Sequence, residues 1–335
     1  MKLDDNGNCT VECAHLKLRE VIWEATLKCD GDCKYCGSKA VKSEKNPSNL
    51  DIANIVSELV NYPPEIVVLS GGEPGCLDPV VLGNIIKMLS DAGIKVRIVT
   101  NGRVLSYAGS IPNFELLDRI GWSVNEAYSY DPDHIEGFED KITVITNFGT
   151  HNIWNFDEIA KSVQRFGIKC WQVQLTMGDF LLPPDGIAHL RKKIKEYTKD
   201  LNIVVADNLQ ESHICGAGIN SCAITAHGEV IPCLSERSLS PTCAVTSYGS
   251  LYEKSLKDIW EREFRDIRFG CDGWKNSCRK CVKYPLIEPV KKIVFPITID
   301  DNRNDEPWTY PRVTLYGVSD NDVVVYGVGG TRTWR

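Results

Sequence analysis

Residues 29–36 read CDGDCKYC, a loop in which Cys29, Cys33 and Cys36 follow the spacing C-x3-C-x2-C. The chain enters this loop from an apolar run at residues 21–23, which is typical of a buried strand. An iron–sulfur cube normally takes four cysteine ligands, so three cysteines leave one iron open to a ligand from outside the protein. The loop therefore predicts an iron–sulfur site with one chemically accessible iron.

A structural zinc site is the alternative at this loop, because C-x2-C pairs are common zinc ligands. Zinc loops usually combine two C-x2-C units, whereas here one C-x3-C-x2-C pattern follows a predicted strand. We therefore favour iron and sulfide over zinc.

The composition is that of a folded protein without the excess of positive charge that is typical of nucleic-acid-binding proteins. The chain has 335 residues, 43% hydrophobic and 25% charged, and we expect about two domains. Its formal net charge is −7, so we expect no nucleic-acid partner; the cationic run at residues 191–195 fits a solvated helix face, which leaves a local contact open. Neither a signal peptide nor an apolar stretch of ~18 residues is present, and we expect a cytoplasmic protein with no membrane partner.

The cysteine count needs a chemical explanation. The chain has 14 cysteines, and a reducing cytosol disfavours structural disulfides. Three of them lie in the loop at residues 29–36 and seven fall between Cys215 and Cys281. This clustering predicts a second metal-bearing module in the carboxyl-terminal half.

From Arg19 onward, apolar runs rich in β-formers alternate with amphipathic stretches, which indicates βα repeats on a parallel sheet. Gly93 and Gly167 stand where helix carboxyl-terminal glycines belong, and Ser48 is a candidate amino-terminal cap. Periodicity alone fits either a barrel or a doubly wound sheet. The predicted strands are 21–25, 66–70, 96–100, 122–125, 142–146, 171–175 and 203–206, and the predicted helices are 50–61, 79–92, 114–119, 156–166 and 186–197.

The ends of the first three predicted strands carry the motifs. In parallel α/β folds the chemistry gathers at the carboxyl ends of the strands. The first strand leads into the cysteine loop, the second ends in SGGEP at residues 70–74, and the third ends in Thr100-Asn101-Gly102. Two glycines let the backbone approach a neighbour closely, and a carboxylate can bond an ammonium group.

The cysteine loop followed by Gly-Gly-Glu-Pro at the end of the next strand resembles the radical S-adenosylmethionine (SAM) family. The resemblance implies a partial (βα)6 TIM-like barrel, a [4Fe-4S] cluster held by Cys29, Cys33 and Cys36, and SAM bound to its open iron. It also implies an enzyme that cleaves SAM to a 5′-deoxyadenosyl radical, which removes a hydrogen atom from the substrate. In such an enzyme the protein supplies binding, orientation and shielding.

The resemblance further implies where SAM binds. Each contact has a structural alternative, because Gly-Gly-Glu-Pro and Asn101-Gly102 are also ordinary turns and Tyr35 can simply cover the cluster with apolar surface. The implied cofactor-binding residues are Tyr35 against the adenine, Gly71, Gly72, Glu73 and Pro74 near the methionyl group, and Asn101, Ser123, Asn125 and Asn147 at the ends of the third, fourth and fifth strands.

The segment from Cys215 to Cys281 resembles the SPASM/twitch extension of that family. Gly228-x4-Cys233 fits its β-hairpin, and Cys278-x2-Cys281 follows a predicted helix. The resemblance implies one auxiliary [4Fe-4S] cluster, with two as the alternative, and a zinc ribbon is the other interpretation of such pairs. The expected ligands are Cys215, Cys233, Cys278 and Cys281, while Cys222, Cys243 and Cys271 supply a partial second set, alternative ligands or neither.

The expected fold is α/β, a partial (βα)6 TIM-like barrel with a small C-terminal cysteine-rich α+β auxiliary cluster domain. We place an N-terminal extension at residues 1–16, the barrel at 17–207, the auxiliary domain at 208–283 and a C-terminal β-hairpin extension at 284–335. Neither extension contains a chemical motif.

The substrate is predicted less sharply than the radical chemistry. Gly37-Ser38-Lys39-Ala40 resembles a phrase of peptide-maturing family members, which favours cross-linking, epimerisation or dehydrogenation of a ribosomally made peptide. The sequence shows no separate leader-binding domain before the barrel, which weakens that interpretation. The alternatives are a dehydrogenase or epimerase of a small carbohydrate or aminoglycoside, and a metal-stabilised binding scaffold. We expect a reductant partner such as flavodoxin or ferredoxin.

An epimerisation needs a second hydrogen donor, and a cysteine thiol suits that role. Cys222 is the catalytic candidate, with Cys76 and Cys170 behind it. Each has the alternatives of a metal ligand or a buried small apolar residue.

Overall fold

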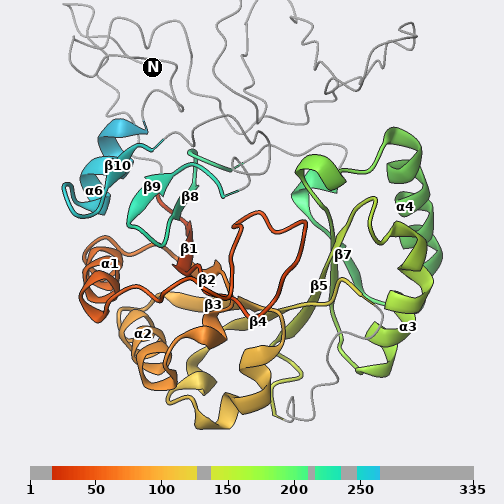
Figure 1. The fold of residues 1–335 in the computed structure, drawn as a ribbon, viewed down its shortest axis with the longest axis horizontal. Helices are drawn as coiled ribbons and strands as arrows, with labels where there is room; N and C mark the ends of the chain where they lie inside the picture. The colour runs from red at the N-terminus through yellow and green to blue at the C-terminus, as the bar shows by residue number, and fades with distance from the viewer. Residues whose placement is uncertain (1–16, 127–136, 210–215, 235–246, 265–335) are drawn as a thin grey trace, which may run out of the picture.

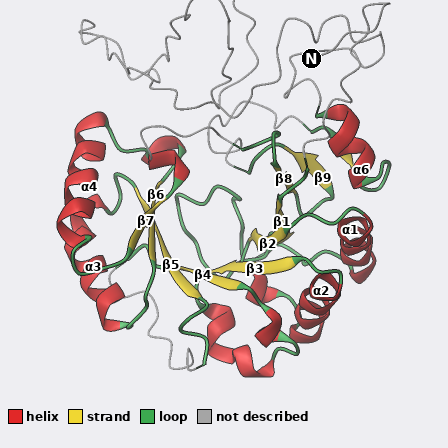
Figure 2. Ribbon diagram, turned by 180° about the vertical axis from the view of Figure 1, so that it is seen from behind, coloured by secondary structure: helices red, strands yellow, loops and turns green. Residues whose placement is uncertain are grey.

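The computed structural model describes residues 17–126, 137–209, 216–234 and 247–264. Its strands form one sheet in the order β10-β9-β8-β1-β2-β3-β4-β5-β6-β7, and neighbours from β1 to β7 are all parallel. The sheet curves into an open arc (Figures 1 and 2). The seven parallel strands are β1 (Glu20–Thr26), β2 (Ile66–Gly71), β3 (Lys95–Thr100), β4 (Arg119–Ser123), β5 (Ile142–Phe148), β6 (Trp171–Leu175) and β7 (Ile203–Val205).

The connecting helices lie on the outside of this arc (Figure 2). Parallel neighbours need crossover connections, and helices on one side of a curved sheet produce a barrel rather than a doubly wound fold. The predicted partial TIM-like barrel is thus confirmed. The helices are α1 (Asn49–Asn61), α2 (Pro79–Asp91), α3 (Phe156–Arg165) and α4 (Pro184–Tyr197), with short 3-10 turns η1 (Pro74–Cys76), η2 (Arg103–Ser110), η3 (Phe114–Leu116), η4 (Ile153–Asn155), η5 (Gly178–Phe180) and η6 (Asp207–Leu209).

Alternation along the strands separates the core from the inside of the arc. On β6, Trp171 and Val173 are buried, and the Trp171 ring packs 5.3 Å from that of Phe156 on the outer helix α3. Successive side chains point to opposite faces of a strand. Gln172 and Gln174 therefore face the inside of the arc, where they are only partly buried.

Local signals in the sequence explain where the helices begin and end. Ser48 Oγ accepts a hydrogen bond from the Asp51 amide at 3.2 Å, and the Asp51 carboxylate accepts one from the Ser48 amide at 3.2 Å. This reciprocal capping box satisfies two amides at the start of α1. Gly93 and Gly167 adopt φ of 78° and 66° directly after α2 and α3, as predicted for carboxyl-terminal glycines.

One element differs from the sequence-based expectation. The predicted helix at 114–119 is only the 3-10 turn η3, and the fourth strand begins at Arg119 rather than at residue 122. Gly121 hid this strand, because glycine is depleted in strands. A Cβ atom at Gly121 would lie 2.5 Å from Ile145 Cδ1 on the neighbouring strand, so a larger residue there would force the end of that side chain to move.

The carboxyl-terminal module continues the same sheet beyond β1. The strand β8 (Ser221–Ile224) runs parallel to β1 and forms an antiparallel hairpin with β9 (Glu229–Ile231), which pairs with β10 (Gly249–Ser250). Gly228 supplies the predicted turn with φ of 75°. A helical turn α6 (Leu256–Asp258) follows, continuing as a π-helical turn at Ile259–Glu263. The boundary expected near residue 208 therefore separates two parts that share one sheet.

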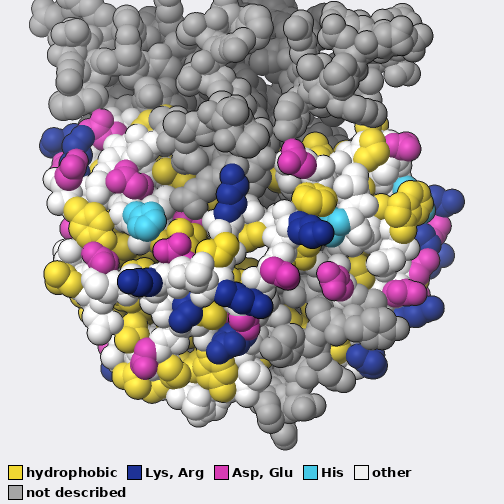
Figure 3. All heavy atoms as spheres, viewed as in Figure 1, with side chains coloured by type: hydrophobic (Ala, Val, Ile, Leu, Met, Phe, Trp, Pro, Cys, Tyr) yellow, Lys and Arg dark blue, Asp and Glu magenta, His cyan; other side chains and the backbone are white. Residues whose placement is uncertain are grey.

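Among the described residues, no helix combines the length and apolar character needed to cross a bilayer. The face in Figure 3 shows basic and acidic side chains interspersed over the barrel.

Replacing Gly83 by alanine tests the packing of α2. A Cβ atom at Gly83 would clash with the Pro112 carbonyl oxygen, which belongs to the backbone and cannot rotate away. We expect Gly83→Ala to lower the free energy of unfolding by about 1–3 kcal/mol, measured by urea denaturation. Gly109→Ala is the matched control, because no atom lies within 4 Å of its added Cβ. Equal urea midpoints for both variants would contradict this packing.

Candidate functional site

The cysteine loop leaves β1 at Thr26 and lies within the arc of strands before the chain reaches α1 (Figure 1). Two of its sulfurs lie beside Gly31, where a Cβ atom would lie 3.5 Å from Cys29 Sγ and 3.7 Å from Cys33 Sγ. The Gly31 amide donates a hydrogen bond to Cys29 Sγ at 3.3 Å. Cys29, Cys33 and Cys36 are all free thiols. The predicted ligand loop therefore carries three unpaired cysteines, and two of their sulfurs lie beside Gly31.

Backbone hydrogen bonds close this loop at its base. The Cys29 amide donates to the Val41 carbonyl at 3.2 Å, and the Val41 amide donates to the Leu27 carbonyl at 3.1 Å. Within the loop, the Cys36 amide donates to the Cys33 carbonyl at 3.0 Å. The three thiols thus lie on a loop whose ends are joined by backbone hydrogen bonds.

The two glycines at the end of β2 press against the start of the cysteine loop. Gly71 has φ of 101°, and a Cβ atom there would lie 2.6 Å from the Thr26 carbonyl oxygen. A Cβ atom at Gly72 would clash with the Lys28 carbonyl oxygen. The close approach lets the Gly72 amide donate to Thr26 at 2.7 Å and the Glu73 amide donate to Lys28 at 2.9 Å. Only glycine fits both positions.

Glu73 is buried beneath this junction, with 1% of its surface exposed. Its Oε1 accepts hydrogen bonds from the Gly75 amide at 2.9 Å and from Thr100 Oγ1 at 2.8 Å, and its Oε2 accepts one from the Asn101 amide at 2.8 Å. Burial raises the pKa of this carboxyl group to about 7, against the lowering effect of these donors. A carboxylate has about four acceptor positions, so the protein itself uses most of them. Pro74 follows as the buried first residue of η1.

Asn101 connects the end of β3 to the cysteine loop. Its Nδ2 donates a hydrogen bond to Asp30 Oδ1 at 2.8 Å, and Arg103 Nη1 donates to Asp30 Oδ2 at 3.0 Å. Gly102 between them has φ of 107°, which fits the predicted turn. Sequence reasoning found Asn101 but missed Asp30 and Arg103. An acid inside the cysteine loop and a base after the Asn-Gly turn were the available signals.

The ends of β4, β5 and β6 carry a row of side-chain amides. Asn125 Oδ1 accepts a hydrogen bond from the backbone N–H of Asn147 at 2.7 Å, and Asn147 Oδ1 accepts one from Gln174 Nε2 at 2.5 Å. Ser123, the last residue of β4, is partly buried two residues before Asn125. The structure thus brings the predicted residues together and adds Gln174. The alternation of glutamines with buried residues along β6 was the signal for it.

Tyr35 stacks on a residue that sequence reasoning missed. Its ring centroid lies 4.2 Å from that of His151, with 21° between the planes, and the Phe180 ring stands edge-on to His151 at 5.4 Å. Both His151 ring nitrogens are buried, and neither has a hydrogen-bond partner among the described residues. His151 therefore covers one face of the ring predicted to contact adenine. It lies on the loop after β5, where strand patterns give no signal.

The remaining cysteines are placed unevenly. Cys222 on β8 is 1% exposed and lies opposite Val21 of β1, which favours the alternative that it packs as a small apolar residue. Cys76, Cys170 and Cys233 are partly buried. In the part of the chain that the structure describes, no three His, Cys, Asp or Glu side chains surround a position for a single metal ion. The predicted residues outside the described ranges are Cys215, Cys243, Cys271, Cys278 and Cys281.

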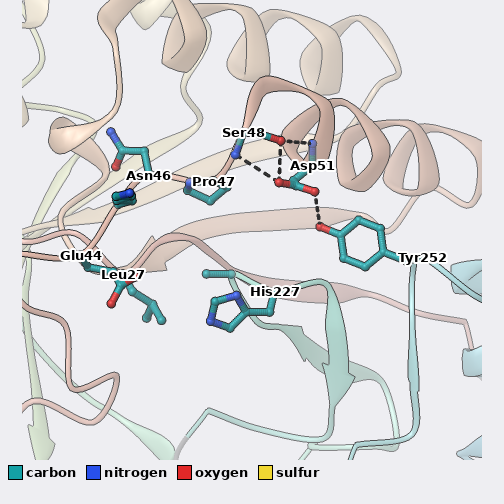
Figure 4. Close-up of a pocket in the computed structure, with 10 residues that line it drawn as sticks. Leu27, Glu44, Asn46, Pro47, Ser48, Asp51, His227 and Tyr252 are labelled. Carbon is teal, nitrogen blue, oxygen red and sulfur yellow. Dashed lines mark hydrogen bonds between the residues drawn. The ribbon is translucent and has the colours of Figure 1, made fainter.

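A hollow of about 440 Å³ lies where the β8–β9 hairpin and the segment after β10 meet the start of α1 (Figure 4). Tyr252 donates its hydroxyl hydrogen to Asp51 Oδ1 at 2.9 Å across this junction. None of the three loop cysteines lines the hollow. Its lining comes from the start of the barrel and from the carboxyl-terminal module, so the hollow lies at the contact between them. Its lining residues are Leu27, Glu44, Lys45, Asn46, Pro47, Ser48, Asp51, Ala226, His227 and Tyr252.

Two parts of the chain match known families. Residues 23–173 match the radical SAM superfamily, and residues 215–282 match SPASM, an iron–sulfur cluster-binding domain. The 7-carboxy-7-deazaguanine synthase of Hyperthermus butylicus is 31% identical over 74 residues, which is 22% of this chain and 31% of that protein. An S-adenosylmethionine-dependent nucleotide dehydratase of a Fibrobacter species is 28% identical over 119 residues, which is 33% of this chain and 35% of that protein. The chain thus matches about a third of the length of these relatives.

Solved structures share the fold. SuiB of Streptococcus suis superposes with a TM-score of 0.57 at 17% identity, covering 75% of this chain and 68% of SuiB. The anSMEcpe structure with bound AdoMet gives a TM-score of 0.52 at 11% identity, covering 74% of this chain and 82% of that one. At these identities the likeness shows the barrel architecture.

Glu73→Gln tests the buried carboxyl group. Because burial raises the native pKa to about 7 from an ordinary 4.5, the native state binds more protons than the unfolded state between these values. Stability therefore falls as pH rises from 4.5 to 7, by up to about 3 kcal/mol. We expect this decline to be lost in Glu73→Gln and kept in Glu115→Gln, an exposed control, in urea denaturation at pH 5 and pH 8. A wild-type pH dependence in Glu73→Gln would contradict the assignment.

Proposed function

Because this chain belongs to the radical SAM superfamily and carries a SPASM domain after its barrel, we propose that it is an enzyme that cleaves SAM reductively and modifies a peptide. The observation that carries the proposal is the junction of the cysteine loop with Gly71-Gly72-Glu73 at the carboxyl ends of β1 and β2. A metal site with a purely structural role does not need the end of a second strand, here β2, in backbone contact with its ligand loop.

The residues fit the cofactors that this family uses. Cys29, Cys33 and Cys36 would hold a [4Fe-4S] cluster with an open iron for SAM, since the three free thiols lie on one tied loop. Burial raises the pKa of the Cys29 thiol to about 11, so cluster binding has to displace its proton. We assign Cys233 to an auxiliary cluster, together with Cys215, Cys278 and Cys281.

When bound, the cluster and SAM supply one-electron cleavage of the sulfonium and a carbon radical that takes a hydrogen atom from the substrate. The chain's own residues prepare the place for this chemistry. The Gly71–Glu73 backbone fixes the edge of the site next to the loop. The rings of Tyr35, His151 and Phe180 pack against one another, and we propose that they shield the site from water.

A peptide is the substrate that we favour. Side-chain amides both donate and accept hydrogen bonds, as peptide groups do, and the partly buried Gln172 and Gln174 of β6 offer such groups inside the arc, next to the Asn147 side chain. The similar structures that contain a peptide include SuiB bound to the precursor peptide SuiA and anSMEcpe bound to the Cp18Cys peptide. A flavodoxin or ferredoxin is the reductant that we propose.

A small polar molecule is the second candidate substrate. It is favoured by the curated relatives, whose names describe a deazaguanine synthase and a nucleotide dehydratase. Offering reduced enzyme either a short peptide encoded next to its gene or a panel of nucleotides and aminoglycosides distinguishes the two. With the true substrate, the enzyme consumes SAM in proportion to the amount of substrate whose mass changes.

Removing one loop thiol tests the radical chemistry. We expect the anaerobically reconstituted wild type to release 5′-deoxyadenosine under strong reductant, and Cys33→Ala to fall to the level of cluster-free protein, because two thiolates cannot hold the cluster. Cys170→Ala, outside the loop, should keep the wild-type rate. Liquid chromatography with mass detection measures the nucleoside, and metal analysis counts iron. Zinc in place of iron, with no nucleoside, would support the binding-scaffold alternative instead.

A further inference from the structure

Asp30 ties the cysteine loop to the end of β3 through both of its oxygens. It accepts hydrogen bonds from Asn101 Nδ2 at 2.8 Å and from Arg103 Nη1 at 3.0 Å. Arg103 also donates from Nε to the Gly75 carbonyl at 3.3 Å, on the segment that follows the Gly-Gly-Glu motif. One arginine thus joins the cysteine loop, the end of β2 and the end of β3.

This ion pair lies immediately beside a ligand thiol. Asp30 follows Cys29 in the chain, and the next amide, that of Gly31, donates a hydrogen bond to Cys29 Sγ at 3.3 Å. Fixing the Asp30 carboxylate therefore also fixes the amide that points at this sulfur. Hydrogen bonds to the sulfurs and the net charge nearby are among the factors that set the reduction potential of an iron–sulfur cluster.

The two charges oppose each other at this position. The negative charge of Asp30 disfavours further negative charge on the neighbouring sulfur, and the positive charge of Arg103 favours it. Their side chains are only partly exposed, at 31% for Asp30 and 43% for Arg103, so solvent screens them incompletely. Reduction adds an electron to a cluster. The negative charge of Asp30 therefore disfavours reduction, and the positive charge of Arg103 favours it.

We propose that Asp30 and Arg103 are positioning residues that hold the cysteine loop in place and set the reduction potential of its cluster, Asp30 lowering the potential and Arg103 raising it. This inference rests on the proposed function in one respect, that the loop holds a redox-active cluster.

Opposite shifts of the potential test the pair. The midpoint potential is measured by redox titration followed by EPR, without SAM, on the signal that changes when SAM is added to a parallel sample. We expect Asp30→Asn to raise the midpoint, Arg103→Gln to lower it, and the double variant to return close to the wild type. A role limited to loop geometry would move both single variants in one direction.

Two further variants separate charge from folding. Arg103→Lys keeps the positive charge but loses the planar fork, and its midpoint should stay near that of the wild type. Asp118→Asn breaks a similarly exposed ion pair with Arg97 at the start of β4, where Asp118 Oδ2 lies 2.9 Å from Arg97 Nε, and should not shift the midpoint. Iron content and the thermal unfolding midpoint of each variant show that the fold is retained.

The outcomes distinguish this inference from the function on which it rests. A wild type whose EPR signals are all indifferent to SAM would overturn both. A wild type with a SAM-responsive signal, but with single variants that shift together or not beyond Asp118→Asn, would overturn only the role of Asp30 and Arg103.

Discussion

One buried carboxylate, that of Glu73, holds the functional edge of the barrel together. Burying a charge is costly unless hydrogen-bond donors surround it. Here the donors come from its own turn, through the Gly75 amide, and from the next strand, through Thr100 and Asn101. They reach Glu73 only when β2 and β3 end side by side, so satisfying this one group fixes the relative position of two strand ends. The orientation of Asn101 toward the cysteine loop follows from that position.

The glycines before Glu73 transmit this constraint to the cysteine loop. Without side chains at residues 71 and 72, the backbone of β2 comes close enough to bond Thr26 and Lys28 at the end of β1. Three motifs separated in sequence, the cysteines, Gly-Gly-Glu and the Asn-Gly turn, therefore form one hydrogen-bonded unit. In this unit the glycines allow contact with the loop, and Glu73 connects to the neighbouring strand.

The sequence predicted what depends on local pattern and missed what depends on distance. Alternating or continuous apolar runs identified β2 and β6 nearly to the residue, and the candidate cap Ser48 marked the start of α1. The strand β4 was misplaced because its glycine, which lies against Ile145 of the next strand, has no strand signal of its own. Likewise His151 and Arg103 join the site only through contacts with distant loops, which no spacing in the sequence encodes.

Charged groups and side-chain amides are distributed unequally over the site. On β1 to β3, the carboxylates of Asp30 and Glu73 and the guanidinium of Arg103 surround the cysteine loop. A charge change there acts on the loop and on any redox group that the loop would hold. On β4 to β6, the amides of Asn125, Asn147 and Gln174 carry no charge. Glu126 directly follows Asn125, and its charge acts on Tyr35 and His151. Exchanging one amide for another therefore leaves the net charge at these strand ends unchanged, whereas a substitution at Glu126 does not.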